Sequence, residues 1–300
     1  MKDRAADTFE EHRTHLLGLA YRMLGEMAGA EDVVQDAWLK WRRTSEADVR
    51  DPRAWLSTVT IRLALDALKS ARSRRETYVG PWLPEPILPD DVRAFAADAP
   101  AARAELASDL SLALLFVLER LSPEERAAFI LHDAFDCDYA TIAAALEKTE
   151  AACRKLVSRA RERVKHDRPH RSVTGEEHKA LLAQFSEAVR ARDEAALARL
   201  FAPDVEFYSD GGGRMPAALN PIYGSEKVQR LILSLARKFE RDSISVVKPI
   251  EINGRAGLAF IVDGVLDSVL DVETRDGRIC EIYLVRNPDK LARAFAAATT

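Results

Sequence analysis

The stretch LSPEERAAFILHDAFDCDYATIAAALEKTEAACRKLVSRARERV, residues 121–164, decides the fold of the middle of this chain. Ser122 has the side chain of an N-cap, and Pro123 suits the first position of a helix. Glu125 stands where the partner of a capping box belongs, three residues after the cap. These residues predict that a helix begins directly after Leu121.

Two further helices follow in the same stretch. Asp138 precedes a short apolar segment in which Tyr139, Ile142, Ala143 and Leu146 share one face. A turn at residues 147–149, with Thr149 as N-cap, then leads into a helix from 150 to 165. Two helices followed by a short turn and a third helix form the layout of a helix-turn-helix, whose last helix lies in the DNA major groove.

A helical wheel divides that last helix into two faces. We expect one face to be buried: Cys153, Leu156, Val157, Ala160 and Val164. The opposite face carries long donors, and such donors reach guanine edges when they lie near the N-terminal half of a recognition helix. A basic amphipathic helix is also compatible with a merely solvated face. With the preceding helix and turn, we interpret it as a DNA-reading helix with these candidate residues: Arg154, Lys155, Ser158 and Arg159.

Composition sets the limits for the rest of the chain. Its 300 residues are 47% hydrophobic and 31% charged, with a net charge of −4, which is typical of globular domains. We find no apolar run of membrane-spanning length and no secretory signal at the N-terminus. The 3 cysteines are scattered without a metal-binding spacing. We therefore expect a cytoplasmic protein with no metal, no cofactor and no membrane partner.

The texture of the sequence predicts four segments. Residues 1–75 and 106–171 are helical, and residues 76–105 form a linker that holds five of the 13 prolines. Residues 172–300 contain one or two helices and then short strands. The predicted fold class is multidomain, with two all-α domains, the second carrying the helix-turn-helix, followed by an α+β domain.

Two dipeptides predict hairpin turns in this last segment. Asn253-Gly254 and Asp276-Gly277 each supply two residues that tolerate a positive φ, as a type I′ turn requires. The strands that flank them are therefore antiparallel.

The segment AEDVVQDAWLKW, residues 30–41, carries a second candidate surface. We expect a buried stripe on one side of this helix: Val33, Val34, Ala37, Trp38 and Trp41. On the other side, polar residues surround an apolar one. A lone exposed leucine is ordinary on a protein surface. A leucine ringed by carboxylates also suits docking of a basic partner helix, and the candidate residues are Asp32, Gln35, Asp36 and Leu39.

A basic helix is predicted between Arg53 and Arg75, after Asp51-Pro52 interrupts the chain. Basic residues near its C-terminal end are compatible with the helix dipole alone. They are equally suited to contact the phosphates of nucleic acid.

These motifs, in this order, resemble a known family. AEDVVQDAWLKW followed by DPRAWLSTVTIRLALDALKSARSRR is similar to region 2 of an extracytoplasmic-function sigma factor, and residues 121–164 are similar to region 4. YVGPWLPEP in the linker, DGGGR at 210–214 and NPDKL at 287–291 resemble one subgroup, whose members carry a fused SnoaL-like C-terminal domain.

The resemblance implies roles for the candidate residues. Region 2 would dock on the clamp helices of the RNA polymerase β′ subunit through Asp32, Gln35, Asp36 and Leu39. The helix from Arg53 would contact the −10 promoter element and its backbone, through Arg62, Lys69 and Arg72. The helix-turn-helix would read the −35 element through Arg154, Lys155, Ser158 and Arg159.

A SnoaL-like domain encloses an apolar pocket, and enzymes of this fold use a carboxylate in it for acid–base chemistry. Asp263, Asp267 and Glu206 are the candidates here, and we expect His178 to be a surface residue. Because fold does not give function, we predict that the domain is not an enzyme. A small molecule bound in it is a candidate effector.

Three consecutive glycines at 211–213 allow the backbone to approach another segment closely, although a flexible loop would also contain them. The Pro-rich linker is the natural partner, because an extended segment flanked by prolines docks well in a groove. We hypothesise a regulatory contact between two sets of residues: Trp82, Leu83 and Pro84 in the linker, and Asp210, Gly211, Gly212, Gly213 and Arg214 in the loop.

The sequence thus predicts an RNA polymerase sigma factor that gives promoter-specific initiation and is modulated in cis by its C-terminal domain. One alternative is a one-component, ligand-responsive helix-turn-helix regulator. A second is a SnoaL-like enzyme tethered to a DNA-binding segment. The regulator leaves the Asp32–Leu39 surface unexplained, whereas turnover of a keto substrate would establish the enzyme.

Overall fold

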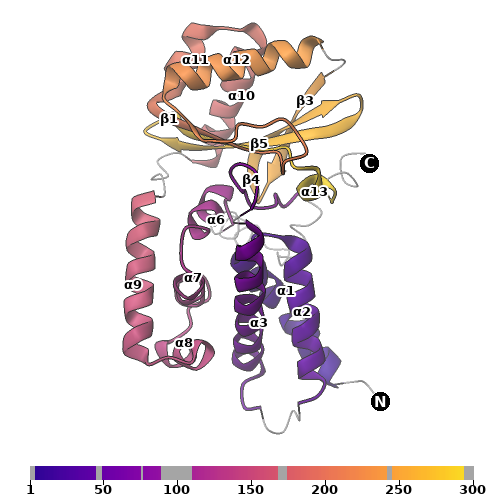
Figure 1. The fold of residues 1–300 in the computed structure, drawn as a ribbon, viewed down its shortest axis with the longest axis vertical. Coiled ribbons are helices and arrows are strands. Elements are labelled where there is room, and N and C mark those ends of the chain that lie inside the picture. The colour runs from indigo at the N-terminus through magenta and orange to yellow at the C-terminus, as the bar shows by residue number, and fades with distance from the viewer. Residues whose placement is uncertain are drawn as a thin grey trace. The chain divides into compact units, whose positions relative to one another are not determined.

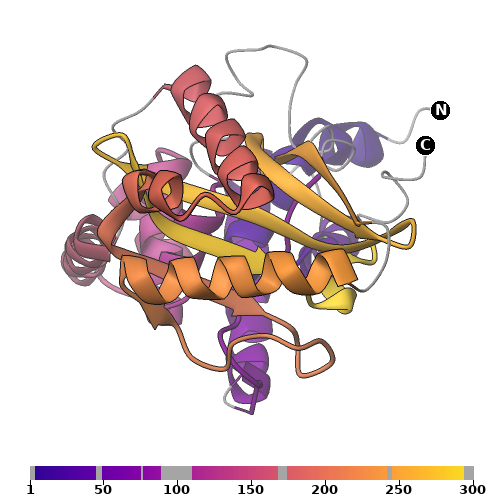
Figure 2. The ribbon, with the colours of Figure 1, turned by 90° about the horizontal axis from the view of Figure 1, so that it is seen from above.

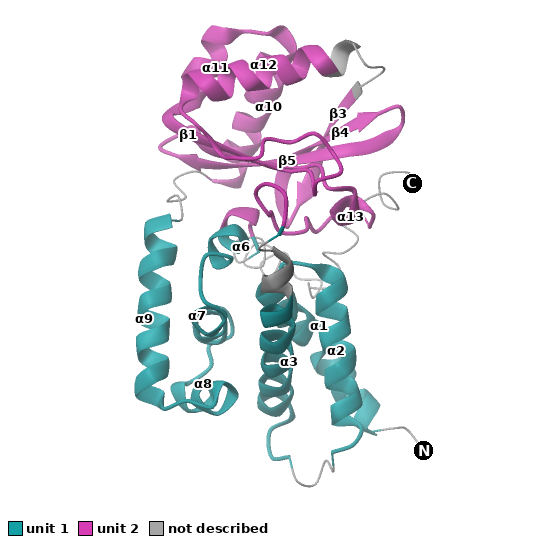
Figure 3. Ribbon diagram, viewed as in Figure 1, with its two compact units in different colours: residues 1–77, 93–110, 114–167 teal, residues 78–92, 111–113, 168–300 magenta. Residues whose placement is uncertain are grey.

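A computed structural model of the chain describes residues 4–44, 49–75, 77–88, 110–167, 174–241 and 245–293. The side chains of residues 71–75, 239–241 and 245 lie outside this description. The chain forms two compact units, shown in Figure 3. Unit 1 comprises Met1–Thr77, Arg93–Leu110 and Leu114–Asp167, and unit 2 comprises Tyr78–Val92, Ser111–Ala113 and Arg168–Thr300.

Three long helices form the first part of unit 1. They are α1 (Arg4–Leu24), α2 (Met27–Trp41) and α3 (Pro52–Arg75), and each packs against the other two. The stripe predicted for α2 is buried except for Trp38, which is half-buried and packs against Phe9 with ring centroids 5.0 Å apart. Trp41 is 1% exposed and also contacts Trp55.

The second part of unit 1 contains the helix-turn-helix. Its elements are α6 (Leu112–Leu118), which belongs to unit 1 from Leu114 onward, α7 (Pro123–Phe129), a π-helical turn η2 (Ile130–Ala134), α8 (Tyr139–Leu146) and α9 (Glu150–Asp167). The predicted capping box at Ser122 and Glu125 is confirmed. Asp138 caps α8 by accepting the amide of Thr141, and Thr149 caps α9 by accepting the amide of Ala152.

Burial confirms both faces of the last helix. The buried residues of α9 are the five predicted ones: Cys153, Leu156, Val157, Ala160 and Val164. In α8, Ile142 is buried, while Tyr139, Ala143 and Leu146 are half-buried. Helix α9 packs mainly on α7 and α8, as expected of a helix-turn-helix core.

The two helical parts pack against each other within unit 1. Helix α3 lies against α7 and α8, and α1 contacts η2. The ring of His15 meets Phe135 edge-on, and the buried guanidinium of Arg126 donates to the carbonyl of Arg22 at 2.9 Å. The sequence patterns concern each part separately, so they did not indicate this interface.

Unit 2 is an α+β domain, as predicted. Its helices are α10 (Gly175–Ala191), α11 (Glu194–Leu200), α12 (Ser225–Arg241) and α13 (Pro288–Leu291). Its strands are β1 (Phe201–Asp210), β2 (Ile222–Tyr223), β3 (Ser245–Ile252), β4 (Arg255–Val262), β5 (Val265–Arg275) and β6 (Arg278–Val285). The sheet order is β2-β1-β6-β5-β4-β3, with β1 and β6 parallel and the other pairs antiparallel.

Helices α10, α11 and α12 cover one face of this sheet, as Figures 1 and 2 show. Their apolar residues and those of the facing strands form one core, which includes Phe185, Phe207 and Ile282. His178 on α10 belongs to this packed layer. It is 4% exposed, and its Nε2 lies 3.0 Å from the carbonyl oxygen of Ala256. The expectation of a surface histidine was therefore wrong, because a strand carbonyl partners the imidazole.

Hairpin turns join the antiparallel strands as predicted. Asn253 and Gly254 have φ angles of 51° and 77°, and Asp276 and Gly277 have φ angles of 53° and 72°. A third turn of the same kind, Asp263-Gly264, joins β4 to β5 and was not predicted.

The packing of His15 gives unit 1 a dependence on pH. Burial, and next the charge of Arg53, lower the pKa of His15 from 6.5 to about 4. The folded state then binds fewer protons than the unfolded state between these values. The contribution of neutral His15 to the free energy of unfolding is fully present above pH 6.5. It is lost as the pH drops towards 4, by as much as about 3 kcal/mol.

We therefore expect His15→Gln to reduce the loss of unfolding free energy between pH 7 and pH 5, because glutamine does not titrate. Urea unfolding followed by tryptophan fluorescence measures this, since Trp38, Trp41 and Trp55 all belong to unit 1. His166→Gln, on the exposed side of α9, is the matched control and should keep the wild-type loss. Equal pH dependence in both variants would contradict the assignment to His15.

Candidate functional site

The outer face of α9 presents the first group of predicted residues. Arg154, Lys155 and Ser158 are all exposed, and Ala151 lies beside them on the same face. Arg154 forms an ion pair with Glu150 one turn earlier, at 2.7 Å. The small side chain at 151 leaves the backbone of the first turns accessible to a ligand.

Arg159, the fourth predicted residue, is placed differently. Its Nε lies 3.5 Å from Glu125, and Arg163 donates to the same carboxylate at 3.1 Å. Glu125 is buried and also closes the capping box of α7. One carboxylate of α7 thus holds two arginines along one flank of α9.

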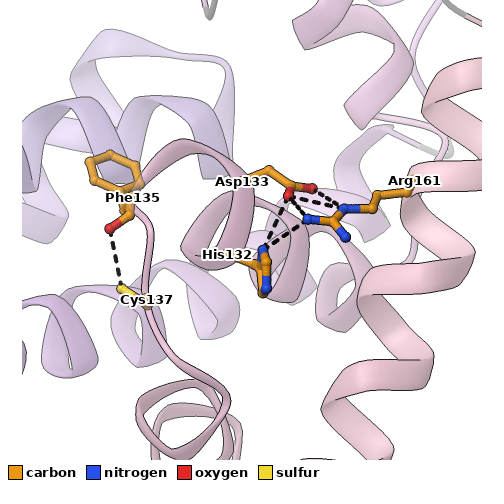
Figure 4. Close-up of polar contacts among 5 residues, drawn as sticks. All are labelled: His132, Asp133, Phe135, Cys137 and Arg161. Carbon is orange, nitrogen blue, oxygen red and sulfur yellow. Dashed lines mark hydrogen bonds and ion pairs between the residues drawn. The ribbon is translucent and has the colours of Figure 1, made fainter.

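A second carboxylate holds the other flank, as Figure 4 shows. Asp133 lies in the π-helical turn and accepts from Nε of Arg161 at 3.0 Å, while His132 Nδ1 lies 3.0 Å from Nη2 of the same arginine. The hydrogen bond that Arg161 donates to Asp133 raises the pKa of Arg161. Sequence reasoning missed His132 and Asp133, because a π-helical turn changes which residues face α9 and has no sequence signal here.

The predicted surface of α2 is assembled as expected in geometry. Asp32, Gln35 and Asp36 are exposed, and Leu39 is 42% exposed among them. The buried stripe on the other side of α2 fixes this orientation, so the four side chains share one accessible face.

The three basic residues predicted on α3 have different surroundings. Nη2 and Nε of Arg62 donate to the carbonyls of Ala144 and Ala145 at 2.6 and 3.1 Å, and Nη2 lies 3.3 Å from Glu147. Arg62 therefore caps the C-terminal end of α8. Lys69 is exposed. Arg72 lies in α3, but its side chain is outside the described residues.

In unit 2, Asp210 at the end of β1 binds the linker. Its carboxylate accepts from the hydroxyl of Tyr78 at 2.5 Å and from the amide of Leu83 at 2.9 Å. Lys290 on α13 forms an ion pair with Asp210 at 2.7 Å and also donates to the carbonyl of Leu83. Asp210 is fully buried and Lys290 is 6% exposed, so these charges are satisfied inside the protein.

Aromatic rings of the linker complete this site. Nζ of Lys290 lies 3.9 Å from the ring centroid of Trp82 and 5.2 Å from that of Tyr78. Asn287 donates to the Tyr78 hydroxyl at 2.8 Å. Further along, the backbone amide of Ile87 donates to the side-chain oxygen of Asn253. The backbone amide of Asn253 in turn donates to the carbonyl oxygen of Ile87. The linker from 78 to 88 is thus bound to the α+β domain along its length.

The glycine loop has the close approaches that its composition predicts. A Cβ on Gly211 would lie 2.1 Å from the carbonyl oxygen of Met215, and one on Gly212 would lie 2.5 Å from Asn287. A Cβ on Gly213 would contact Val79 of the linker at 3.4 Å. Arg214 instead pairs with Asp289 of α13 and is exposed. Asp210 and Lys290 both make buried polar contacts with the linker. The motif NPDKL contains Lys290, but the sequence predicts no role for this residue.

The candidate acids of unit 2 do not gather around the apolar core. Asp263 is exposed in a turn, Asp267 pairs with Arg286, and Glu206 accepts from Tyr208. Within the described part of the chain, no group of three His, Cys, Asp or Glu residues is arranged to hold a metal ion. No described helix is both long enough and apolar enough to span a membrane.

Comparisons with known proteins agree with this geometry. Residues 8–74 match the family Sigma-70 region 2, and residues 111–164 match Sigma-70, region 4. The two helical parts of unit 1 are therefore regions 2 and 4 of a sigma factor, which is a transcription initiation factor and not an enzyme.

Two relatives from Mycobacterium tuberculosis extend the match over nearly the whole chain. The ECF RNA polymerase sigma factor SigJ is 39% identical over 292 residues, which cover 94% of this chain and 91% of SigJ. The probable ECF sigma factor SigI is 33% identical over 297 residues, covering 96% and 95%. The crystal structure of SigJ aligns with a TM-score of 0.76 at 36% identity, covering 96% of this chain and 98% of SigJ.

This chain belongs to the extracytoplasmic-function RNA polymerase sigma factors and carries a fused C-terminal α+β domain. Its function is promoter-directed transcription initiation with RNA polymerase.

The contact of Arg62 with α8 generates a prediction about stability. Arg62→Ala removes two hydrogen bonds from a charged donor and should lower the unfolding free energy of unit 1 by about 1 kcal/mol, since the side chain is 46% exposed. Lys69→Ala, on the exposed side of the same helix, should change it by less than about 0.5 kcal/mol. Urea unfolding followed by tryptophan fluorescence compares the two, and equal midpoints would show that the contact contributes nothing.

Proposed function

We propose that the outer face of α9 reads the −35 promoter element in the major groove. Arg154, Lys155 and Ser158 are its base-contacting residues, and Arg159 contributes from the flank held by Glu125. The observation that carries this proposal is the exposure of three long or polar donors on the N-terminal half of a recognition helix whose opposite face is buried.

Region 2 docks on the polymerase through Asp32, Gln35, Asp36 and Leu39, and the partner surface is the β′ clamp helices. An exposed leucine within a ring of acidic and amide side chains suits a basic helix with an apolar residue at its centre. The packing of α2 on α1 and α3 presents this face without rearrangement.

Helix α3 contacts the −10 element, with Lys69 and Arg72 on the phosphate backbone and Arg62 available only after it leaves α8. The positions −10 and −35 are about 25 base pairs apart, roughly 85 Å along B-DNA at 3.4 Å per base pair. Because α3 packs directly on α8 in unit 1, the two regions must separate to bind both elements. In this proposal, the form in which α3 packs on α8 is the resting form of the factor in the cytoplasm.

The C-terminal domain modulates activity in cis through the linker. Trp82, Leu83 and Pro84 on one side, and Asp210 with Gly211, Gly212, Gly213 and Arg214 on the other, are the regulatory residues of this proposal. The segment that joins region 2 to region 4 is held by the α+β domain, which supports such control. A small molecule that binds one state of the domain better than another would act as an effector.

Transcription with core polymerase tests the first two assignments separately. Leu39→Asp should weaken binding to core enzyme by about thirtyfold, as expected for a central apolar contact, and should lower transcription accordingly. Arg154→Ala should bind core enzyme normally but lose about tenfold in transcription from its promoter. Pull-down and run-off transcription measure the two effects.

Leu219 is also an exposed leucine, but it lies in unit 2. Leu219→Asp is therefore the matched control and should bind core enzyme normally. If Leu39→Asp also binds core enzyme normally, α2 is not the docking surface. If Arg154→Ala transcribes like the wild type, α9 does not read the promoter through that residue.

The linker contact has its own test, the substitution Asp210→Asn. It leaves Lys290 buried without its opposite charge, at a cost of about 3 kcal/mol, so chymotryptic cleavage after Tyr78 or Trp82 should accelerate on the order of a hundredfold. Promoter-dependent transcription should change with it. Asp204→Asn, which disrupts only the exposed pair with Arg275, should match the wild type in both assays. Equal cleavage and transcription in the two variants would refute control through the linker.

A further inference from the structure

Arg154 is held on an aromatic ring in addition to its ion pair. Its Cζ lies 4.8 Å from the ring centroid of Tyr139, the first residue of α8. Tyr139 is half-buried, and the ring of His132 packs on it with centroids 4.8 Å apart and an interplanar angle of 44°. Three groups from three elements, η2, α8 and α9, therefore pack one on the next, with a tilted contact between the two rings.

The ring stack is anchored at its inner end. His132 Nδ1 lies 3.1 Å from Asp133 and 3.0 Å from Nη2 of Arg161, the contacts drawn in Figure 4. His132 and Asp133 are 23% and 22% exposed, against 55% for Arg154. Tyr139 therefore rests on a layer that is less accessible than the arginine it supports.

Stacking and base reading use different parts of a guanidinium group. The planar face lies on the aromatic ring, whereas the N–H donors point outward in the plane of the group. Glu150 occupies one edge of Arg154 at 2.7 Å. The ring contact fixes the side chain without consuming a donor, and a bidentate contact with O6 and N7 of guanine needs a fixed pair of donors.

We propose that Tyr139 is a specificity-determining positioning residue, which orients Arg154 to read a guanine in the −35 element. This inference rests on the proposed −35 role of Arg154. An arginine that is already oriented loses less side-chain freedom on binding, so its preference for guanine is larger than that of a mobile one.

Two other roles for Tyr139 give different outcomes. If its hydroxyl contacts a phosphate, then removal of the hydroxyl alone weakens binding to every sequence. If it only packs in the core of region 4, then its loss weakens the fold and all base positions alike. The proposed role affects one base position and depends on the ring.

The experiment uses holoenzyme reconstituted from core polymerase and the full chain. Promoter duplexes randomised across the −35 element are bound, and sequencing of the bound fraction gives a base preference at each position. Arg154→Ala should lose a guanine preference at one position. Tyr139→Met should lower that same preference by about fivefold and leave the other positions unchanged.

Tyr139→Phe keeps the ring and should stay within about twofold of the wild type at that position. In the double variant with Arg154→Ala, Tyr139→Met should add no further loss, because the two residues act together. Tyr223→Met in β2, an exposed tyrosine of unit 2, is the matched control and should match the wild type.

Three results overturn the inference: an unchanged preference in Tyr139→Met, an equal loss at all positions, or a loss in Tyr139→Phe as large as in Tyr139→Met. If thermal melting shows that Tyr139→Met does not fold, Tyr139→Phe and Tyr139→Trp decide, since both keep an aromatic face. Loss of the guanine preference in either then refutes it. If Arg154→Ala changes no position, the proposed base reading by Arg154 has failed and the inference fails with it.

Discussion

A buried ion pair between Lys290 and Asp210 holds residues 78–83, which belong to the segment between the two sigma regions. Taking two charges out of water costs several kcal/mol for each, and geometry must recover that cost. Here Lys290 also donates to the carbonyl of Leu83 and lies on the ring of Trp82, while Asp210 accepts from Tyr78 and the amide of Leu83. The polar groups of the linker replace part of the water contacts that each charge lost on burial. The linker and the ion pair therefore stabilise each other.

In region 4, acidic residues on α7 and η2 control the arginines of α9. Glu125 holds Arg159 and Arg163 on one flank, and Asp133 holds Arg161 on the other. This arrangement leaves the face between the flanks with an orderly set of donors, although the whole chain has a net charge of −4. If α9 reads the promoter as proposed, the specific placement of these few cations compensates for the absence of a general positive charge.

Local patterns predicted the elements well, and long-range contacts account for what they missed. The caps at Ser122, Asp138 and Thr149 and the buried face of α9 depend on residues within one turn of each other. Arg62 contacts α8 and His178 contacts β4, and in each case the partner lies about 80 residues away in the sequence. Periodicity identifies which side chains face inward, but not which carbonyl or ring they meet there.

The position of the linker in the sequence differs from its position in the fold. Residues 78–88 stand between regions 2 and 4 in the sequence, yet they belong to the compact unit formed by the C-terminal residues. The residues that form this compact unit are therefore not contiguous in the sequence. Exchange of this domain between related factors therefore has to include residues 78–88 as well as the C-terminal residues. A factor that received the C-terminal residues alone would lack the segment that Asp210 and Lys290 bind.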